Sequence, residues 1–161
     1  MTRFFDLDEA NATLPEVRTI LEGLRDERAE LIRLRDQVVE RQDSEEAPSE
    51  AAATEANVPG KVPGKGRPAE PAKAEGKTTD AELRVLRLRM QGVIDQMQAG
   101  VARIDELGIT LREIETGLID FPALASGRQI WLCWRLGEED VEWWHELAEG
   151  FTGRRALADL T

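Results

Sequence analysis

The residues with the greatest chemical capacity gather in one short stretch of the chain. All four tryptophans, the only histidine and the only cysteine lie between Trp131 and His145. Imidazole and thiol groups supply metal ligands, general bases and nucleophiles, and tryptophan is enriched at binding surfaces. We therefore expect specificity to be located in residues 120–154.

An acidic run after Gly137 predicts a short helix that ends before Gly150. Steps of about 100° per residue would bring four side chains to one face of that helix. They are Glu138, Glu142, His145 and Glu149. Glu142 and His145 have the i, i+3 spacing of carboxylate-bridged di-iron bundles, although one chain supplies a single such pair. The alternative is a solvated acidic face that includes a histidine.

A metal or small-anion site centred on His145 is therefore one hypothesis, with His145 and Glu142 as the metal ligands. Its further candidate residues are Glu138, Glu149, Asp120, Arg135 and Arg154. A nitrogen ligand among carboxylates favours a divalent transition metal such as Zn²⁺, Mn²⁺ or Fe²⁺ over Ca²⁺. The two arginines are suited to a carboxylate or phosphate, or alternatively to ion pairs with the neighbouring glutamates.

The other residues of the stretch indicate structure more than catalysis. Cys133 lies in the middle of an alternating segment, where a buried structural thiol is more common than a nucleophile. The chain has no Gly-x-Ser-x-Gly elbow, which argues against acyl transfer. Trp134 and Trp144 are expected in the core, whereas Trp131 and Trp143 point elsewhere and are expected on an interaction surface.

Two long helices are expected to position this stretch. Apolar residues recur at seven-residue spacing before residue 42 and again over 79–108, which predicts an antiparallel helical hairpin, a coiled-coil arm. The first set is Leu14, Val17, Leu21, Leu24, Leu31 and Val38, with Arg28 and Arg35 at two seam positions; the second is Leu83, Leu86, Met90, Val93, Met97, Ile104 and Leu107. Pro15 is expected to separate a short helix over residues 8–12 from the long one.

The remaining segments complete a mainly α fold of the α+β class in one domain. Residues 1–42 would hold the first arm helix and 79–108 the second, and 109–157 a β-hairpin followed by the short helix. Ser126-Gly127 is a turn signal, and Pro122 is expected to break the first strand. Residues 43–78 are rich in proline and lack aromatic residues, which predicts a disordered linker. That linker is either an insertion at a loop tip or a tether for a partner.

Charge and hydropathy exclude several classes of function. Asp and Glu number 32 against 21 Lys and Arg, a net charge of −11, which disfavours nucleic acid and anionic membranes as partners. No apolar run is long enough for a transmembrane helix, and no signal peptide is evident. A single cysteine fits a reducing compartment, so we expect a soluble cytoplasmic protein.

Several spaced motifs carry a family resemblance. They are DFP (120–122), Gly127, LCW (132–134), GE (137–138), WHE (144–146) and GFxGR (150–154), together with FFDLDEANATLPEVR at residues 4–18. Through these motifs the chain resembles the bacterial domain-of-unknown-function 2203 family. The resemblance covers the whole chain except the linker. The resemblance implies the organisation described above and carries no activity with it.

Our first functional hypothesis is a non-enzymatic interaction or scaffold protein without a cofactor. Apolar residues outside the seam predict a homodimer formed through the arm, and another protein partner is also compatible. These residues are Ile20, Ile32, Val39, Val85, Leu88 and Ile94. The alternative is the metal- or small-anion-binding protein centred on His145, which includes the case of a metal-dependent enzyme.

Overall fold

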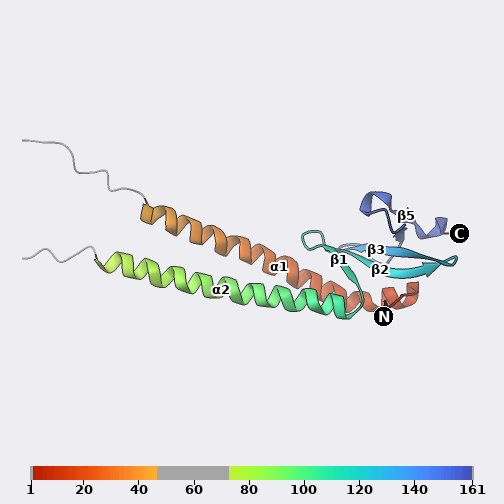
Figure 1. The fold of residues 1–161 in the computed structure, drawn as a ribbon, viewed down its shortest axis with the longest axis horizontal. Coiled ribbons are helices and arrows are strands. Elements are labelled where there is room, and N and C mark those ends of the chain that lie inside the picture. Colours follow the sequence, from red (N-terminus) through yellow and green to blue (C-terminus); the bar gives the residue numbers. More distant parts are fainter. Residues whose placement is uncertain (1, 47–72, 161) are drawn as a thin grey trace, which may run out of the picture. The chain divides into compact units, whose positions relative to one another are not determined.

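The computed structural model describes residues 2–46 and 73–160, and it has the predicted α+β class. Two helices, α1 (Leu7–Glu46) and α2 (Lys73–Glu106), precede the strands (Figure 1). The strands are β1 (Thr110–Glu113), β2 (Leu118–Ala125), β3 (Arg128–Arg135), β4 (Trp143–His145) and β5 (Arg155–Ala156), with 3₁₀ turns at Phe151–Gly153 and Leu157–Asp159. Most of the linker expected over residues 43–78 lies outside the described residues.

The chain divides into two compact units. Residues 1–33 and 91–161, here called the sheet unit, contain the first part of α1, the last part of α2 and all the strands. Residues 34–90, here called the helical unit, contain the remaining parts of the two helices.

Helix α1 begins with reciprocal hydrogen bonds and continues through Pro15. The Glu9 amide donates to the Asp6 carboxylate (2.7 Å), and the Asp6 amide donates to the Glu9 carboxylate (3.2 Å), which is a capping box. The expected break at Pro15 is wrong, because α1 is a single helix. Leu14 and Val17 are buried on either side of the proline, and their packing offsets the hydrogen bond that proline cannot make.

The two helices form the predicted hairpin. In the sheet unit, Arg103 of α2 pairs with Glu16 of α1 at 2.7 Å. A Cβ on Gly100 would lie only 2.9 Å from a methyl carbon of Leu24, so glycine permits close approach of the helices. In the helical unit the buried residues are Leu34, Leu83 and Leu86.

The strands form one antiparallel sheet in the order β1-β2-β3-β4-β5. Ser126 and Gly127 have positive φ and close the β2–β3 hairpin as predicted. The expected break at Pro122 is wrong, because Pro122 lies within β2 opposite Trp131. Its carbonyl accepts from the Phe5 amide (2.8 Å), beyond the end of β1, so the missing N–H interrupts no strand pairing.

The helix expected over residues 138–149 is absent, and β4 lies there instead. Trp144 pairs with Leu132 of β3, and both Trp144 and His145 are buried. Burial and sheet pairing of these two large side chains outweigh the acidic residues that favoured a helix. The fold-class prediction is confirmed, whereas this element within it was wrong.

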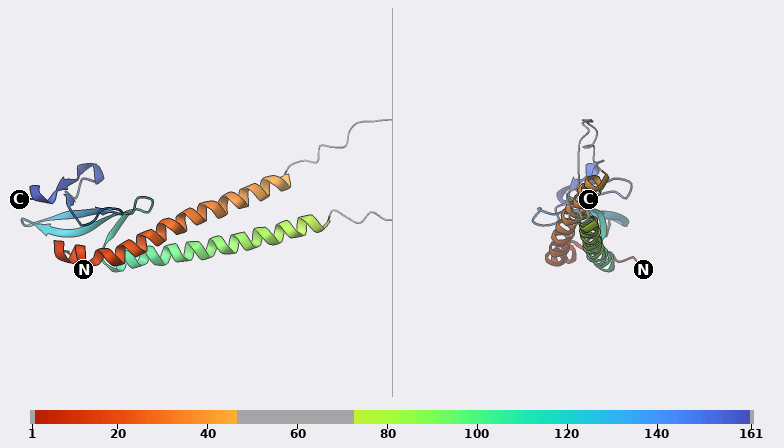
Figure 2. Two further views of the ribbon diagram at one scale, coloured as in Figure 1. Left: turned by 180° about the vertical axis from the view of Figure 1, so that it is seen from behind. Right: turned by 90° about the vertical axis from the view of Figure 1, so that its left-hand side faces the viewer.

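One face of the sheet packs against the helices of the same unit, as Figures 1 and 2 show. The core contains Phe121 and Trp134 from the sheet and Leu14 and Leu21 from α1. Side chains alternate along a strand. Asp120, Cys133 and His145 are the sequence neighbours of the core residues Phe121, Trp134 and Trp144 and therefore lie on the opposite face.

Candidate functional site

The structure brings together two of the predicted site residues. His145 Nε2 lies 3.2 Å from Asp120 Oδ1. Glu138 instead pairs with Arg154 (2.7 Å) and Glu149 with Arg155 (2.9 Å), while Glu142 is exposed. Without the helix, the four-residue acidic face does not form. Glu142 is not in the cluster around His145.

Cys133 is the third member of that cluster. Asp120, Cys133 and His145 come from β2, β3 and β4 in turn, and their potential ligand atoms all lie within 4.8 Å of one another. Cys133 of β3 is the register partner of Asp120 of β2. His145 of β4 is the register partner of Trp131 and therefore lies diagonally across from Cys133. Pairing of three strands therefore places an oxygen, a sulfur and a nitrogen donor side by side.

All three side chains are buried. The exposed fractions are 2% for Asp120, 1% for Cys133 and 1% for His145. Burial, and secondarily the charge of Asp120, raise the pKa of the Cys133 thiol to about 12. A thiol with such a pKa is not a nucleophile at neutral pH, which supports the structural interpretation of Cys133 over a catalytic one.

The hydrogen bonds around the cluster orient its members. His145 Nδ1 lies 2.8 Å from the Glu146 carbonyl, which can only accept, so Nδ1 carries a hydrogen. Arg112 Nε donates to Asp120 Oδ2 at 2.7 Å. The remaining atoms, His145 Nε2 and Asp120 Oδ1, have no hydrogen-bond partner among the described residues. They are the two atoms that face each other.

Arg154, a predicted anion-binding residue, is engaged within the protein. It donates two hydrogen bonds of 2.7 Å to Glu138, and its guanidinium carbon lies 5.2 and 4.8 Å from the ring centres of Trp143 and Phe151. Burial alone would raise the pKa of Glu138, but the hydrogen bonds and charges of Arg154 and Arg135 together lower it below its usual value. Of the two alternatives for Arg154, binding of an anion or an ion pair with a neighbouring glutamate, the structure contains the ion pair.

The other predicted residues lie around the same face. Trp131 and Trp143 are half-buried, with Arg112 stacked 4.9 Å from the ring centre of Trp131. Arg135 is exposed and stacks on Phe151 at 5.2 Å. Each of these two indole rings thus has a cation over its face.

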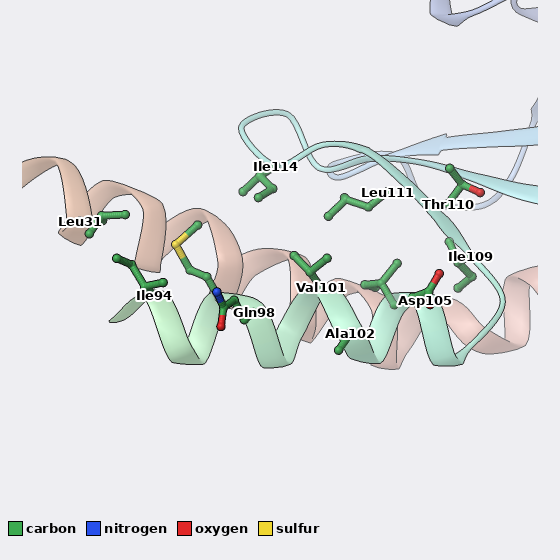
Figure 3. Close-up of a pocket in the computed structure, with 12 residues that line it drawn as sticks. Leu31, Ile94, Gln98, Val101, Ala102, Asp105, Ile109, Thr110, Leu111 and Ile114 are labelled. Carbon is green, nitrogen blue, oxygen red and sulfur yellow. The ribbon is translucent and has the colours of Figure 1, made fainter. Parts of the chain in front are cut away.

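An apolar groove in the sheet unit was not predicted as such. It has a volume of about 690 Å³ and lies between the end of α2 and β1, with Val101 pointing toward Leu111 (Figure 3). Its lining residues are Leu31, Ile94, Met97, Gln98, Val101, Ala102, Ile104, Asp105, Ile109, Thr110, Leu111 and Ile114. The one indication of the groove in the sequence analysis is Ile94, an apolar residue outside the helical seam that lines it.

The sequence was compared with models of known protein families. A family model described as "Uncharacterized conserved protein (DUF2203)" matches residues 3–157. The chain belongs to the DUF2203 family. The match confirms the resemblance found in the sequence, and it includes both the buried cluster and the groove of this DUF2203 chain.

No curated protein and no solved structure matches the chain. Among the helices of residues 2–46 and 73–160, none combines the length and apolar character needed to cross a membrane.

Proposed function

We propose that the chain is a non-enzymatic interaction protein that self-associates, with the groove of one copy receiving a helix of a second copy. The observation that carries this proposal is the groove itself, whose helical floor is left open to solvent. Val101, at its centre, is 38% exposed. Contiguous exposed apolar surface of this kind marks interaction sites in proteins.

The lining of the groove favours a helix as occupant. Ile94, Gln98, Val101 and Asp105 recur at helical spacing along α2, and β1 forms the facing wall. β1 is a short edge strand with exposed charged residues, Arg112 and Glu113. Such edges resist the addition of another strand, whereas an apolar trough beside a helix accepts an amphipathic helix.

The helical unit offers a segment of matching chemistry. Val85 and Leu88 of α2 lie one turn apart and are 56% and 67% exposed, while Leu83 and Leu86 are the residues buried beside them. Val85 and Leu88 therefore form an apolar row that is not covered within the described chain. Side chains at i, i+3 share one helical face and can enter a groove together.

Charge favours the same occupant. Arg84 and Arg87 flank the apolar row and have no ion-pair partner among the described residues. The groove includes Asp105, and the chain as a whole carries a net charge of −11. A basic and apolar helix is thus the complement of an acidic surface, and residues 83–90 of a second copy supply one.

Reciprocal exchange would make the dimer closed. Each copy would give its 83–90 segment and receive that of its partner, so both contacts would be used and the symmetry would be two-fold. Of the apolar residues first noted outside the seam, Ile20 packs on the core and Ile94 lines the groove. A cytoplasmic location belongs to this proposal, since the single cysteine is buried and unpaired.

Analytical ultracentrifugation of the full chain tests the proposal. The wild type is expected to sediment at twice its 18.0 kDa mass at micromolar concentration. Val101→Glu in the groove and Leu88→Glu in the row should each shift the chain to the monomer. Leu124→Glu is the matched control, because Leu124 is 60% exposed and lies outside the groove lining.

Mixing the two variants adds a directional test. The groove of the Leu88→Glu chain and the row of the Val101→Glu chain are both intact, so the mixture should recover a heterodimer. A monomeric wild type, or a dimer unaffected by either substitution, would overturn the proposal. A monomer that binds a different basic amphipathic helix would show that the groove serves another partner.

A further inference from the structure

We propose that Asp120, Cys133 and His145 bind one divalent transition-metal ion, with Zn²⁺ as the best match. The inference is independent of self-association. It keeps His145 and Asp120 from the site expected on sequence grounds and replaces Glu142 by Cys133. Its basis is the position and hydrogen bonding of the three buried side chains.

His145 Nε2 and Asp120 Oδ1 are 3.2 Å apart, yet no hydrogen bond joins them. Nδ1 holds a ring hydrogen on the Glu146 carbonyl, so in a neutral imidazole the lone pair on Nε2 would face a carboxylate oxygen. Two buried acceptors in this position are costly unless something positive lies between them.

The ligand spacing suits a tetrahedral ion. Zn²⁺ holds thiolate sulfur at about 2.3 Å and nitrogen or oxygen at about 2.0–2.2 Å, which places neighbouring ligands roughly 3.3–3.7 Å apart. The separation between His145 Nε2 and Asp120 Oδ1 is already close to this value. The three donor atoms lie within 4.8 Å of one another, so roughly 1 Å of side-chain adjustment completes the arrangement.

Outer hydrogen bonds hold the ligands as they do in metal sites. A metal-bound histidine normally donates its other ring N–H to a carbonyl or carboxylate, and bound carboxylates are themselves hydrogen-bonded. His145 donates to the Glu146 carbonyl, and Asp120 Oδ2 accepts from Arg112. Both partners leave the potential ligand atoms, Nε2 and Oδ1, without a hydrogen bond and 3.2 Å apart.

The donor set selects the class of ion. Calcium and magnesium prefer oxygen ligands throughout, whereas one sulfur, one nitrogen and one oxygen suit Zn²⁺. Binding would exchange the thiol proton of Cys133 for the metal–sulfur bond and release that proton to solvent. Thiolate and carboxylate together would balance the charge of the divalent ion, and a water molecule would fill the fourth position.

The burial of the site indicates a structural ion. The exposed fraction of each ligand is at most 2%, so the cluster offers little access to a substrate. The ion would link β2, β3 and β4, the last of which is only three residues long. A cross-strand link would stabilise β4, which has few sheet hydrogen bonds of its own.

Metal titration of the full-length, untagged chain tests the inference. After treatment with chelator, the protein is loaded with Zn²⁺ or Co²⁺ and washed. One equivalent of metal by elemental analysis, a raised melting temperature and a thiolate-to-cobalt absorption band are the expected results. The band reports a cobalt–sulfur bond in the wild type itself, so the test does not depend on the folding of a variant.

Conservative variants assign the ligands. Cys133→Ser should abolish the cobalt–thiolate band, and His145→Gln should weaken metal binding at least tenfold. Glu142→Gln is the matched control and should bind as the wild type does, because Glu142 is outside the cluster. Absence of bound metal and of any shift in melting temperature would overturn the inference. So would metal that remains equally bound in Cys133→Ser and His145→Gln, since it would then be held by surface carboxylates only.

Discussion

His145 of β4 and Asp120 of β2 meet across the intervening strand β3, with 3.2 Å between Nε2 and Oδ1. Neither atom has a hydrogen-bond partner in the described part of the chain. An amide at position 120 would change this relationship. Its oxygen would keep the bond from Arg112, and its nitrogen would donate to His145 Nε2.

Asp120→Asn is therefore expected to leave metal-free stability within about 0.5 kcal/mol of the wild type, because a buried acceptor gains a donor. Zn²⁺ should stabilise only the wild type, by about 2.7 kcal/mol at a hundredfold excess over its Kd. Urea unfolding in chelator and in Zn²⁺ measures both values. A loss of about 1–3 kcal/mol in chelator would instead indicate that His145 is protonated and ion-paired with Asp120.

The ion pair of Glu138 with Arg154 predicts a pH dependence of stability. Burial raises the pKa of Glu138, but the hydrogen bonds and charge of Arg154 together with the backbone hydrogen bond and charge of Arg135 outweigh it, so the pKa lies below its ordinary value of 4.5 in the folded chain. Its stabilisation is thus present above that ordinary value and is lost as the pH falls through the lower folded pKa. Glu138→Gln should be less stable than the wild type at pH 7, and the difference should shrink in acid.

Urea unfolding of both proteins across the acidic range checks this sign. Glu139→Gln serves as the control, because Glu139 is the exposed neighbour and lies outside the ion pair. A difference between Glu138→Gln and the wild type that grows on acidification would contradict the assignment.

Two glycines of α2 should respond differently to alanine. A Cβ on Gly92 meets nothing within 4 Å, so Gly92→Ala should stabilise the chain by about 0.5–1 kcal/mol through helix propensity. A Cβ on Gly100 would lie 2.9 Å from Leu24 Cδ2, which forces the helices apart or shifts that side chain. Gly100→Ala should therefore gain nothing or lose stability in a thermal melt. Equal stabilisation by both changes would show that α1 and α2 are not in close contact at Gly100.

The burial of Cys133 predicts an unreactive thiol. Because burial and the charge of Asp120 raise the pKa of Cys133 to about 12, little thiolate is present at pH 8. The native chain should react with a chromogenic disulfide reagent only as fast as it opens, and the chain in denaturant should react at once. Rapid modification of the native chain in chelator would mean that the cluster is open to solvent.

The sequence was informative where the signals are local. Heptad spacing correctly predicted the helical hairpin, Asp6 and Glu9 form a capping box, and Ser126-Gly127 makes the hairpin turn. Such features depend on residues close to one another in the chain, so the sequence alone predicts them. The break expected at Pro15 is wrong because packing around it outweighs its local preference. The break expected at Pro122 is wrong because its missing N–H lies beyond the end of β1 and interrupts no strand pairing.

The cluster was only partly predictable. His145 and Asp120 were named from their types, but Glu142 was given as a ligand because a helix was expected where β4 lies. For Cys133 the sequence predicts only a structural role, since nothing local indicates that Asp120 and His145 lie beside it. The sequence determined the periodic elements and the residue types, while pairing of β2, β3 and β4 decided which side chains meet. The physical reason is that strand pairing joins residues far apart in the chain, and its free energy comes from burial of residues such as Trp144 rather than from any local pattern.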